Sequence, residues 1–270
     1  MRNLYLTQTA TIVDIKSQNS MVRVFVLKPE NGKLFNYWPG QFINLSIKGF
    51  GEAPFAVCSA PSKTGEFQIC AQKKGVLTGK LFALSMGDKV GFRGPYGNGF
   101  PLSKIAKRNL TLIAGGVGLA PLRPLIQLIR SRSFEFGKIQ LFCGAREKQM
   151  LLFQNEYDAW QKHLQINLTL DIASENWKGN VGLITDLFDK IKLVKNPVLI
   201  MCGPAIMYPA VIKKLKQKKV TEKDIYVLLE RRMHCGIGIC QHCVLVNGKY
   251  VCKDGPVFNY AEIKNSPGAI

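Results

Sequence analysis

Short apolar or alternating segments of strand length fill the first hundred residues. They are Ala10–Ile15, Met21–Leu27, Gln41–Ile47 and Phe67–Ala71. Turn residues such as Asn31-Gly32 and Pro39-Gly40 separate them. Short strands with regular turns are typical of an antiparallel barrel or sandwich. One helix is predicted at Thr78–Leu84.

From about residue 108 the pattern changes to buried strands that alternate with helical segments. The predicted strands are Asn109–Ala114, Ile139–Cys143, Ile166–Ile172, Pro197–Met201 and Asp224–Leu229. The predicted helices are Pro121–Arg130, Phe153–His163, Ile184–Ile191 and Ala205–Lys218. Such alternation predicts a parallel sheet with crossover helices, and we expect Asp224–Leu229 to be its last strand.

The chain has 270 residues, which suits two domains and a small appendage. We predict domains at 1–103, 104–229 and 230–270. No apolar run has the length of a membrane span, and the first residues do not resemble a signal peptide, so we expect a cytoplasmic protein that is not transmembrane. In that compartment its 8 cysteines would be thiols or ligands.

Four cysteines near the C-terminus follow the spacing C-x4-C-x2-C-x8-C. They are Cys235, Cys240, Cys243 and Cys252. This order is typical of plant-type [2Fe–2S] ligands. Gly236 and Gly238 suit a loop that wraps closely around a cluster. Zinc is the alternative, but zinc sites usually pair two C-x2-C knuckles and only one is present, so we favour the cluster.

Two glycine motifs follow predicted strands of the second domain. Gly115-Gly-Val-Gly118 precedes the helix that starts at Pro121, and Cys202-Gly203-Pro204 follows a later strand. Backbone amides at a strand–helix junction favour phosphate. Each turn alone is a weak signal, but ligands of parallel sheets bind at the carboxyl ends of strands, so we expect the two motifs to converge on one site.

The formal net charge is +19, and the sequence pI is about 9.7. A cluster of lysines lies in a segment with helical period: Lys213, Lys214, Lys216, Lys218 and Lys219. This excess of positive charge indicates either a surface that docks onto an acidic partner or an ordinary solvated surface. No stacking aromatics are interleaved with the lysines, so we expect no nucleic-acid partner.

Taken together, these motifs resemble the ferredoxin-NADP+ reductase superfamily. The chain is similar to the gamma subunit of cytoplasmic hydrogenase/sulfur reductases, to one subunit of anaerobic sulfite reductase and to the electron-transfer subunit of dihydroorotate dehydrogenase. The resemblance spans essentially the whole chain. It implies a β-barrel FAD domain, an α/β Rossmann-like NAD(P) domain and a small C-terminal [2Fe–2S] domain.

The resemblance implies two flavin-binding elements. The first is the stretch Pro54, Phe55, Ala56, Val57, Cys58 and Ser59. The family has an Arg and a Ser or Thr where this chain has Ala53 and Ala56, which removes a cationic phosphate contact and a hydrogen bond near the isoalloxazine. The second element contains Gly75, Leu77 and Thr78, whose amides would bind the FAD pyrophosphate; Thr78 also reads as a helix N-cap.

For NAD(P), the resemblance implies a phosphate turn and a nicotinamide site. Gly115, Gly116, Gly118 and Pro121 would shape the turn; Cys202, Gly203 and Pro204 would lie near the nicotinamide. Arg146 would meet the adenosine ribose or a 2′-phosphate, or it is an ordinary surface arginine. The sequence does not choose between NADH and NADPH.

Electron-transfer subunits combine a site for hydride from NAD(P)H, a cluster that carries single electrons and a flavin that connects the two. We therefore expect this chain to be such a subunit. No acid–base catalytic set stands out, so we expect the terminal active site on a partner subunit of the hydrogenase/sulfur or sulfite reductase type. An acidic iron–sulfur carrier is a second partner class. The alternatives are a dihydroorotate dehydrogenase electron-transfer subunit, a stand-alone NAD(P)H–ferredoxin-type reductase and a zinc-stabilised interaction module.

Overall fold

A computed structural model gives the fold, and it describes residues 3–173 and 175–270. The chain forms two compact units, each built from two stretches of sequence. The first unit contains residues up to 100 together with 230–256, and the second contains 101–229 and 257–270. The cysteine-rich segment therefore belongs with the N-terminal strands, whereas the last fourteen residues belong with the α/β unit. The predicted division into three domains stays a prediction.

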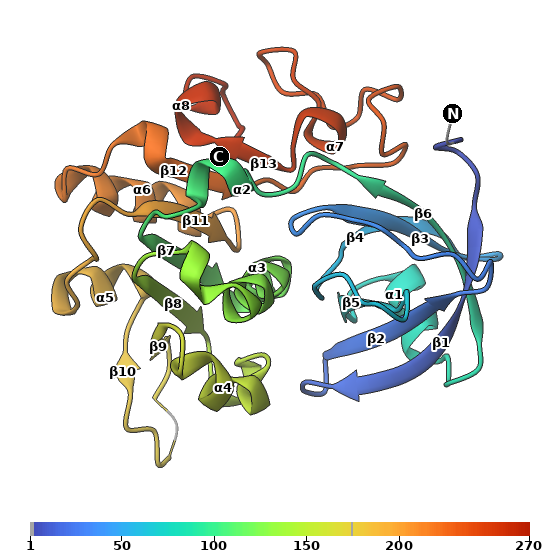
Figure 1. Ribbon diagram of the computed structural model, residues 1–270, viewed down its shortest axis with the longest axis horizontal. Coiled ribbons are helices and arrows are strands. Elements are labelled where there is room, and N and C mark those ends of the chain that lie inside the picture. Colours follow the sequence, from blue (N-terminus) through green and yellow to red (C-terminus); the bar gives the residue numbers. More distant parts are fainter. Residues whose placement is uncertain (1–2, 174) are drawn as a thin grey trace. The chain divides into compact units, whose positions relative to one another are not determined.

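The first unit is built on a six-stranded antiparallel barrel (Figure 1). Its strands are β1 (Gln8–Ser17), β2 (Val22–Pro29), β3 (Phe42–Ile47), β4 (Gly51–Ala56), β5 (Phe67–Gln72) and β6 (Lys89–Tyr96). They pair in the order β4-β3-β6-β1-β2-β5. A bridge between Val57 and Ile69 connects the two ends of this order. The four strands predicted for this part of the chain are confirmed as β1, β2, β3 and β5. The residue pattern did not predict β4 and β6.

Physical reasons for the two missed strands lie in their composition. β4 contains Pro54, which cannot donate to a ladder, and β6 contains Gly91, Gly94 and Pro95. Both residue types are depleted in strands and mark edges or bulges. β4 stands at one end of the strand order, where a proline is tolerated.

The barrel interior is filled by apolar side chains that alternate along the strands. On β3, Ile43, Leu45 and Ile47 enter this core. The rings of Phe35, Phe67 and Phe92 contact one another in it, with centroids 4.5–5.3 Å apart. Because alternate positions point outward, Asn44 lies on the outer face of β3, and its complete burial needs another cover, which the cysteine-rich segment supplies.

The second unit is a seven-stranded sheet with the order β10-β9-β8-β7-β11-β12-β13. Its strands are β7 (Leu110–Gly115), β8 (Ile139–Ala145), β9 (Gln165–Leu170), β10 (Asn180–Val181), β11 (Val198–Cys202), β12 (Ile225–Leu228) and β13 (Val257–Asn259). All neighbours are parallel except β13, which runs antiparallel to β12. The prediction that Asp224–Leu229 ends the sheet is wrong, because a strand that follows the cysteines pairs beyond it.

Helices connect these strands or border the units. The α-helices are α1 (Val76–Phe82), α2 (Leu102–Ile105), α3 (Leu119–Ser131), α4 (Tyr157–Gln161), α5 (Ile184–Lys190), α6 (Met207–Gln217), α7 (Val251–Asp254) and α8 (Tyr260–Ile263). Short 3-10 turns lie at Gly116–Gly118, Ser133–Glu135, Lys148–Met150, Gln154–Glu156 and Glu222–Asp224. The predicted helix Phe153–His163 is shorter in the structure, because Phe153 has a left-handed φ of 57° and a 3-10 turn precedes α4.

Candidate redox-cofactor sites

The four cysteines predicted as ligands lie in one segment of the first unit. A bridge between Val244 and Tyr250 closes a loop in this segment, and α7 follows it. The thiols lie as two pairs in contact through their side chains, one pair being Cys235 with Cys240 and the other Cys243 with Cys252. Cys243 and Cys252 are buried, while Cys235 and Cys240 are partly exposed. Among the residues that the structure describes, no three His, Cys, Asp or Glu side chains are grouped around one metal-ion position.

Backbone amides donate to all four sulfurs, and that of Cys240 accepts from the amide of His242. Gly238 N lies 3.2 Å from Cys252 Sγ, Ile239 N lies 3.3 Å from Cys235 Sγ, and Cys252 N lies 3.5 Å from Cys243 Sγ. Gly236 and Gly238 have φ values of 80° and 82°, which glycine adopts without strain and which turn these amides inward. Amide donors stabilise the thiolate, which is the form of cysteine that binds metal.

Burial and amide bonding act in opposite directions on these thiols. Burial raises the pKa of Cys235, but hydrogen bonds from the amides of Cys240, Ile237 and Ile239 outweigh it and lower the pKa overall. The pKa of Cys240 is also lowered, chiefly by the amide of His242. Burial raises the pKa of Cys252 to about 12. Two thiol pairs with amide donors are a donor set that fits an iron–sulfur group.

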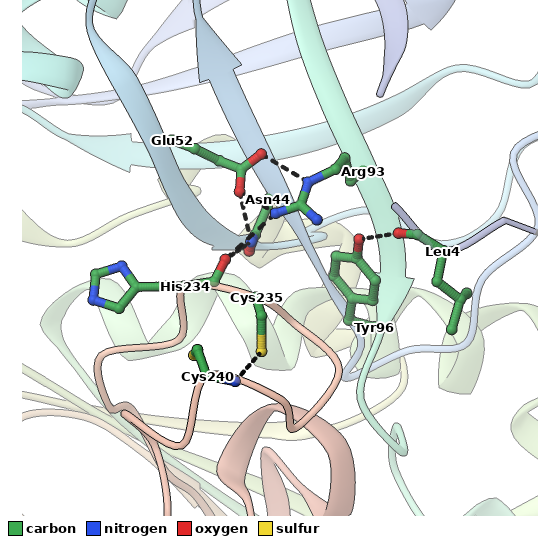
Figure 2. Close-up of polar contacts among 8 residues, drawn as sticks. All are labelled: Leu4, Asn44, Glu52, Arg93, Tyr96, His234, Cys235 and Cys240. Carbon is green, nitrogen blue, oxygen red and sulfur yellow. Dashed lines mark hydrogen bonds and ion pairs between the residues drawn. The ribbon is translucent and has the colours of Figure 1, made fainter. Parts of the chain in front are cut away.

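The cysteine loop is attached to the barrel by polar side chains that sequence reasoning missed. Asn44 on β3 and Arg93 on β6 donate to the carbonyl oxygen of His234, and Glu52 on β4 accepts from both of these side chains (Figure 2). Nothing in the sequence connects three separate strands with a residue about 140–190 positions later. In the predicted strand Gln41–Ile47, Asn44 alternates with Ile43 and Leu45 as an outward-facing polar residue does, so its burial could not be predicted.

The first predicted flavin element divides into a surface part and a buried part. Pro54, Phe55 and Ala56 are partly exposed on β4, whereas Val57 and Cys58 are buried. Ser59 is also buried, and its hydroxyl lies 2.9 Å from the Tyr37 hydroxyl and 3.0 Å from Gln68 N, which donates to it. The structure therefore leaves Pro54–Ala56 accessible to a ligand and uses the Ser59 hydroxyl inside the fold.

The second predicted flavin element forms the start of α1. The Thr78 hydroxyl accepts from the amides of Lys74 and Gly75 at 2.9 Å. The N-cap of α1 is Gly75, and Thr78 is the third helical residue, so the interpretation of Thr78 as the N-cap is wrong, although its hydroxyl satisfies the N-cap amide. Leu77 packs against the barrel core. Gly75 and Gly79 are in open space, because a Cβ added at either would meet no atom within 4 Å. Nothing in the protein itself requires glycine at these two positions, which suits a ligand that approaches the backbone.

The two flavin elements come together in the structure, because α1 contacts both β3 and β4. On the same helix, the Lys80 ammonium lies 5.3 Å from the centre of the Phe50 ring, just before β4 begins. A cation thus lies beside the start of the strand that contains Ala53. An exposed backbone turn, a partly exposed apolar strand and an adjacent cation fit a pyrophosphate-linked flavin.

In the second unit, the structure brings the two glycine motifs together. Strands β7 and β11 are neighbours, with Ala114 opposite Cys202. Gly118 packs on the backbone of Cys202 and Gly203, and a Cβ there would lie 2.7 Å from Gly203 N. Gly115 likewise packs on Pro204, so its Cβ would lie 2.8 Å from the proline Cδ. Both motifs therefore form one turn-lined edge at the carboxyl ends of the strands.

The remaining predicted nucleotide residues lie at this edge. Gly116 has a φ of 52° and open space around its Cα, and Pro121 is partly exposed in the first turn of α3. Arg146 is exposed and directly follows β8, the strand beside β7. The backbone amides of the Gly116–Gly118 turn, with a cationic side chain after the neighbouring strand, fit a nucleotide phosphate or ribose.

Comparison with known proteins gives three family matches in order along the chain. The oxidoreductase FAD-binding domain matches residues 9–100, and the oxidoreductase NAD-binding domain matches 112–213. The iron–sulfur cluster binding domain of dihydroorotate dehydrogenase B matches residues 230–264. No helix among the described residues combines the length and the apolar character needed to cross a membrane.

Individual relatives match over most of their length. The sulfhydrogenase 2 subunit gamma of Pyrococcus furiosus is 38% identical, over 99% of this chain and 100% of that protein. A probable dihydroorotate dehydrogenase B (NAD(+)) electron transfer subunit of Methanocella arvoryzae is 33% identical, over 93% of this chain and 90% of that protein. The solved NADH-dependent reduced ferredoxin-NADP oxidoreductase has a TM-score of 0.80 and 27% identity, over 94% of this chain and 88% of that chain.

Proposed function

We propose that this chain is the electron-transfer subunit of a hydrogenase or sulfur reductase type complex. It belongs to the ferredoxin-NADP+ reductase superfamily, in the branch that contains sulfhydrogenase gamma subunits and dihydroorotate dehydrogenase B electron-transfer subunits. Similarity to the sulfhydrogenase gamma subunit along essentially the whole chain, cysteine segment included, carries this proposal. The chain is an oxidoreductase that takes electrons from NAD(P)H or gives them to NAD(P)+, and a partner holds the terminal catalytic site.

FAD would be held by the barrel. The amides at the start of α1 would bind its pyrophosphate, with Thr78 holding the turn in shape. Lys80 would supply the cation that Ala53 lacks, and Pro54 to Ala56 would lie along the ring system. When bound, FAD exchanges hydride with NAD(P)H and single electrons with an iron–sulfur centre.

The iron–sulfur group would be a [2Fe–2S] cluster. The structure supports this through its two thiol pairs, since a binuclear cluster shares four cysteines between two irons. Cys235 and Cys240 would hold one iron, and Cys243 and Cys252 the other. The amides of Gly238 and Ile239 would donate to the sulfurs and stabilise their negative charge.

NAD(P)H would bind at the carboxyl edge of the second unit's sheet. The Gly115–Gly118 turn would receive the phosphates, because Gly116 leaves its backbone accessible. Cys202 to Pro204 would border the nicotinamide. Arg146 would contact the adenosine ribose or a 2′-phosphate. This chain's own contribution is to bind and orient the hydride donor.

The partner would dock by charge. A cavity of about 500 Å³ lies at the amino ends of the second unit's strands, opposite the nucleotide edge, and Arg108, Lys192, Lys218 and Lys219 line it together with Asp224. Four cations against one carboxylate attract an acidic subunit or an acidic iron–sulfur carrier. We place the complex in the cytoplasm, because its cysteine ligands need a reducing compartment.

Anaerobic purification of the chain tests the cofactors. We expect about one FAD, about two irons and about two sulfides per chain, and absorbance bands that bleach when NADH or NADPH is added. The nucleotide that bleaches them faster identifies the physiological donor. A colourless chain with one zinc would refute the redox proposal in favour of an interaction module.

Purification of the chain from its native cells under anaerobic conditions tests the partner. We expect a hydrogenase-type catalytic subunit to co-purify, with hydrogen-dependent reduction of NAD(P)+ or sulfur-dependent oxidation of NAD(P)H. Full turnover by the isolated chain with a small carrier such as ferredoxin would instead indicate a stand-alone reductase.

A dihydroorotate dehydrogenase electron-transfer role is the second candidate. The match of residues 230–264 to the cluster-binding domain of dihydroorotate dehydrogenase B favours it. It predicts a flavoprotein partner and dihydroorotate-dependent reduction of NAD+ by the native complex, which a hydrogenase-type complex would not catalyse.

A further inference from the structure

A polar network joins the flavin-binding strand to the cysteine loop within the first unit. Arg93 on β6 makes a two-point ion pair with Glu52, its Nε lying 2.9 Å from one carboxylate oxygen. Glu52 lies on β4, two residues before the first flavin element. From these strands, Asn44 Nδ2 and Arg93 Nη2 both donate to the His234 carbonyl oxygen, at 2.7 and 3.4 Å (Figure 2). His234 is the residue before the predicted ligand Cys235.

Asn44 is a costly residue to keep at this place. Its side chain is fully buried, and its Nδ2 donates both to His234 and to Glu52, the latter at 3.0 Å. Its Oδ1 is buried and has no hydrogen-bond partner among the residues that the structure describes. An unsatisfied buried acceptor destabilises a fold by about 1–3 kcal/mol. Stability alone therefore does not explain an asparagine at this position. The role that its hydrogen bonds indicate is to hold the backbone next to Cys235.

Arg93 brings a permanent positive charge to the same place. Its side chain is 13% exposed, so water screens that charge weakly. The hydrogen bond to Glu52 raises the pKa of Arg93, and attraction to the Cys235 thiolate adds to the rise. The Arg93 guanidinium also lies 6.0 Å from the centre of the Tyr96 ring, and that ring packs against Gly236. The cation therefore stands against the loop that carries the first two cysteines.

We propose that Asn44 and Arg93 are positioning residues for the iron–sulfur group, that they hold the loop at Cys235, and that the Arg93 charge raises the reduction potential of the group while Glu52 offsets part of that rise. Reduction adds one electron to the group, and a nearby cation stabilises the added negative charge. The inference rests on the proposed iron–sulfur function.

Removal of the Arg93 charge and removal of the Glu52 charge should shift the reduction potential of the iron–sulfur group in opposite directions. A redox titration monitored by electron paramagnetic resonance measures this potential. Arg93→Gln should lower the ratio of reduced to oxidised cluster at a fixed potential about tenfold, which is a shift of about 59 mV for one electron. Glu52→Gln should raise the ratio, and it keeps the Arg93 and Asn44 donors to His234. Arg93→Lys, which keeps the charge, should stay closer to the wild type than Arg93→Gln.

Lys89→Gln is the matched control, because it removes one positive charge from the same strand four residues away, about 13 Å along β6. It should change the ratio by less than about twofold, since Lys89 is 64% exposed and pairs with Glu30. Equal potentials in Arg93→Gln, Glu52→Gln and the wild type would overturn this inference and leave the proposed function intact. A wild-type chain without an iron–sulfur signal would overturn the proposed function and this inference with it.

Asn44→Ala tests the positioning role by iron loss. We expect iron to pass to an added chelator several times faster than in the wild type, with a changed visible circular dichroism of the cluster, because the His234 carbonyl loses its closest donor. Ser46→Ala, two residues along on the same outward face of β3, should lose iron at the wild-type rate. Equal rates in Asn44→Ala and the wild type would contradict the positioning role.

Discussion

Gly118 lies directly against the peptide of Cys202, so closely that a Cβ on the glycine would overlap the Cys202 carbonyl oxygen. Gly118 has a φ of −62°, which any residue adopts, so the position requires space rather than conformational freedom. The contact ties the turn after β7 to the end of β11. Two motifs that are about 85 residues apart thereby share one surface.

Gly118→Ala should damage the nucleotide site. The new methyl group must push the two turns apart, and overpacking of this kind costs about 1–3 kcal/mol of unfolding free energy. We expect a raised KM for NAD(P)H, measured with an artificial electron acceptor, together with a lower melting temperature. Gly144→Ala is the control, because its Cβ would lie 3.4 Å from the nearest atom, an ordinary contact with Ile184. An unchanged KM in Gly118→Ala would refute the placement of the phosphate turn.

Gly79→Ala should separate folding from flavin binding, because the two effects have opposite signs. In α1 alone, alanine stabilises the helix by about 0.5–1 kcal/mol relative to glycine, and the added Cβ meets no protein atom. If the FAD pyrophosphate approaches this backbone, the same methyl group obstructs it. We therefore expect flavin-free protein to melt higher and bound FAD to dissociate faster.

The flavin control lies on the same helix. Thr78→Ala removes the hydroxyl that accepts from the Lys74 and Gly75 amides and should lower stability by about 1 kcal/mol, while Thr78→Ser keeps the hydroxyl and should restore most of it. FAD retention that is identical in Gly79→Ala and the wild type would move the pyrophosphate site away from α1.

Local pattern was sufficient for much of the fold and for the outline of the sites. Strand and helix periodicity located most of the elements, and cysteine spacing marked the metal-ligating segment because its ligands are close in sequence. The glycine turns could be assigned to one edge since parallel strands end together. Pattern missed β4 and β6 because of their proline and glycine content. It missed β13 for a non-local reason, because this strand is three residues long and is stabilised by pairing with β12.

The network at His234 was invisible for the same reason. Asn44 and Arg93 reach the loop only because strands β3 and β6 are neighbours and each directs one side chain toward the cysteine loop. A single sequence gives no measure of which outward-facing residues share a partner. The burial of Asn44, with one unsatisfied oxygen, becomes informative only in three dimensions.

Alkaline pH should destabilise the second unit through Cys143. Burial raises the pKa of this thiol from 9.0 to about 12, and the neighbouring Tyr157 hydroxyl opposes that rise without cancelling it. Between these values the unfolded chain releases a proton that the folded chain keeps, so unfolding free energy is undiminished below pH 9.0 and falls as pH rises. The slope reaches at most about 1.4 kcal/mol per pH unit.

Denaturant unfolding of Cys143→Ala at several values between about pH 8 and about pH 11 checks this. The variant should be less stable at the lowest pH, because a cavity forms, but its stability should fall less steeply than that of the wild type. Ile113→Val, on the neighbouring strand β7, also removes buried volume and should keep the wild-type slope. Parallel curves for Cys143→Ala and the wild type would exclude the thiol as the cause.

The basic cluster of residues 213–219 contains two kinds of lysine, and they should differ in partner docking. Lys214 pairs with Asp189 at 2.5 Å and Lys216 with Glu222 at 3.0 Å, so neighbouring carboxylates already offset their charges. Lys218 and Lys219 lie beyond the end of α6, are exposed and line the cationic cavity. We expect Lys218→Glu with Lys219→Glu to slow reduction of the acidic partner about tenfold at low salt, and to flatten its salt dependence.

The comparison variant is Lys28→Glu with Lys33→Glu, which makes the same change of net charge at two exposed barrel lysines. It should leave the partner rate within about twofold, because surface charges act over about a Debye length. Reduction of a small neutral dye by NAD(P)H should be equal in all variants, which separates docking from the internal redox steps. If both double variants slow the partner equally, net charge rather than this cavity governs docking.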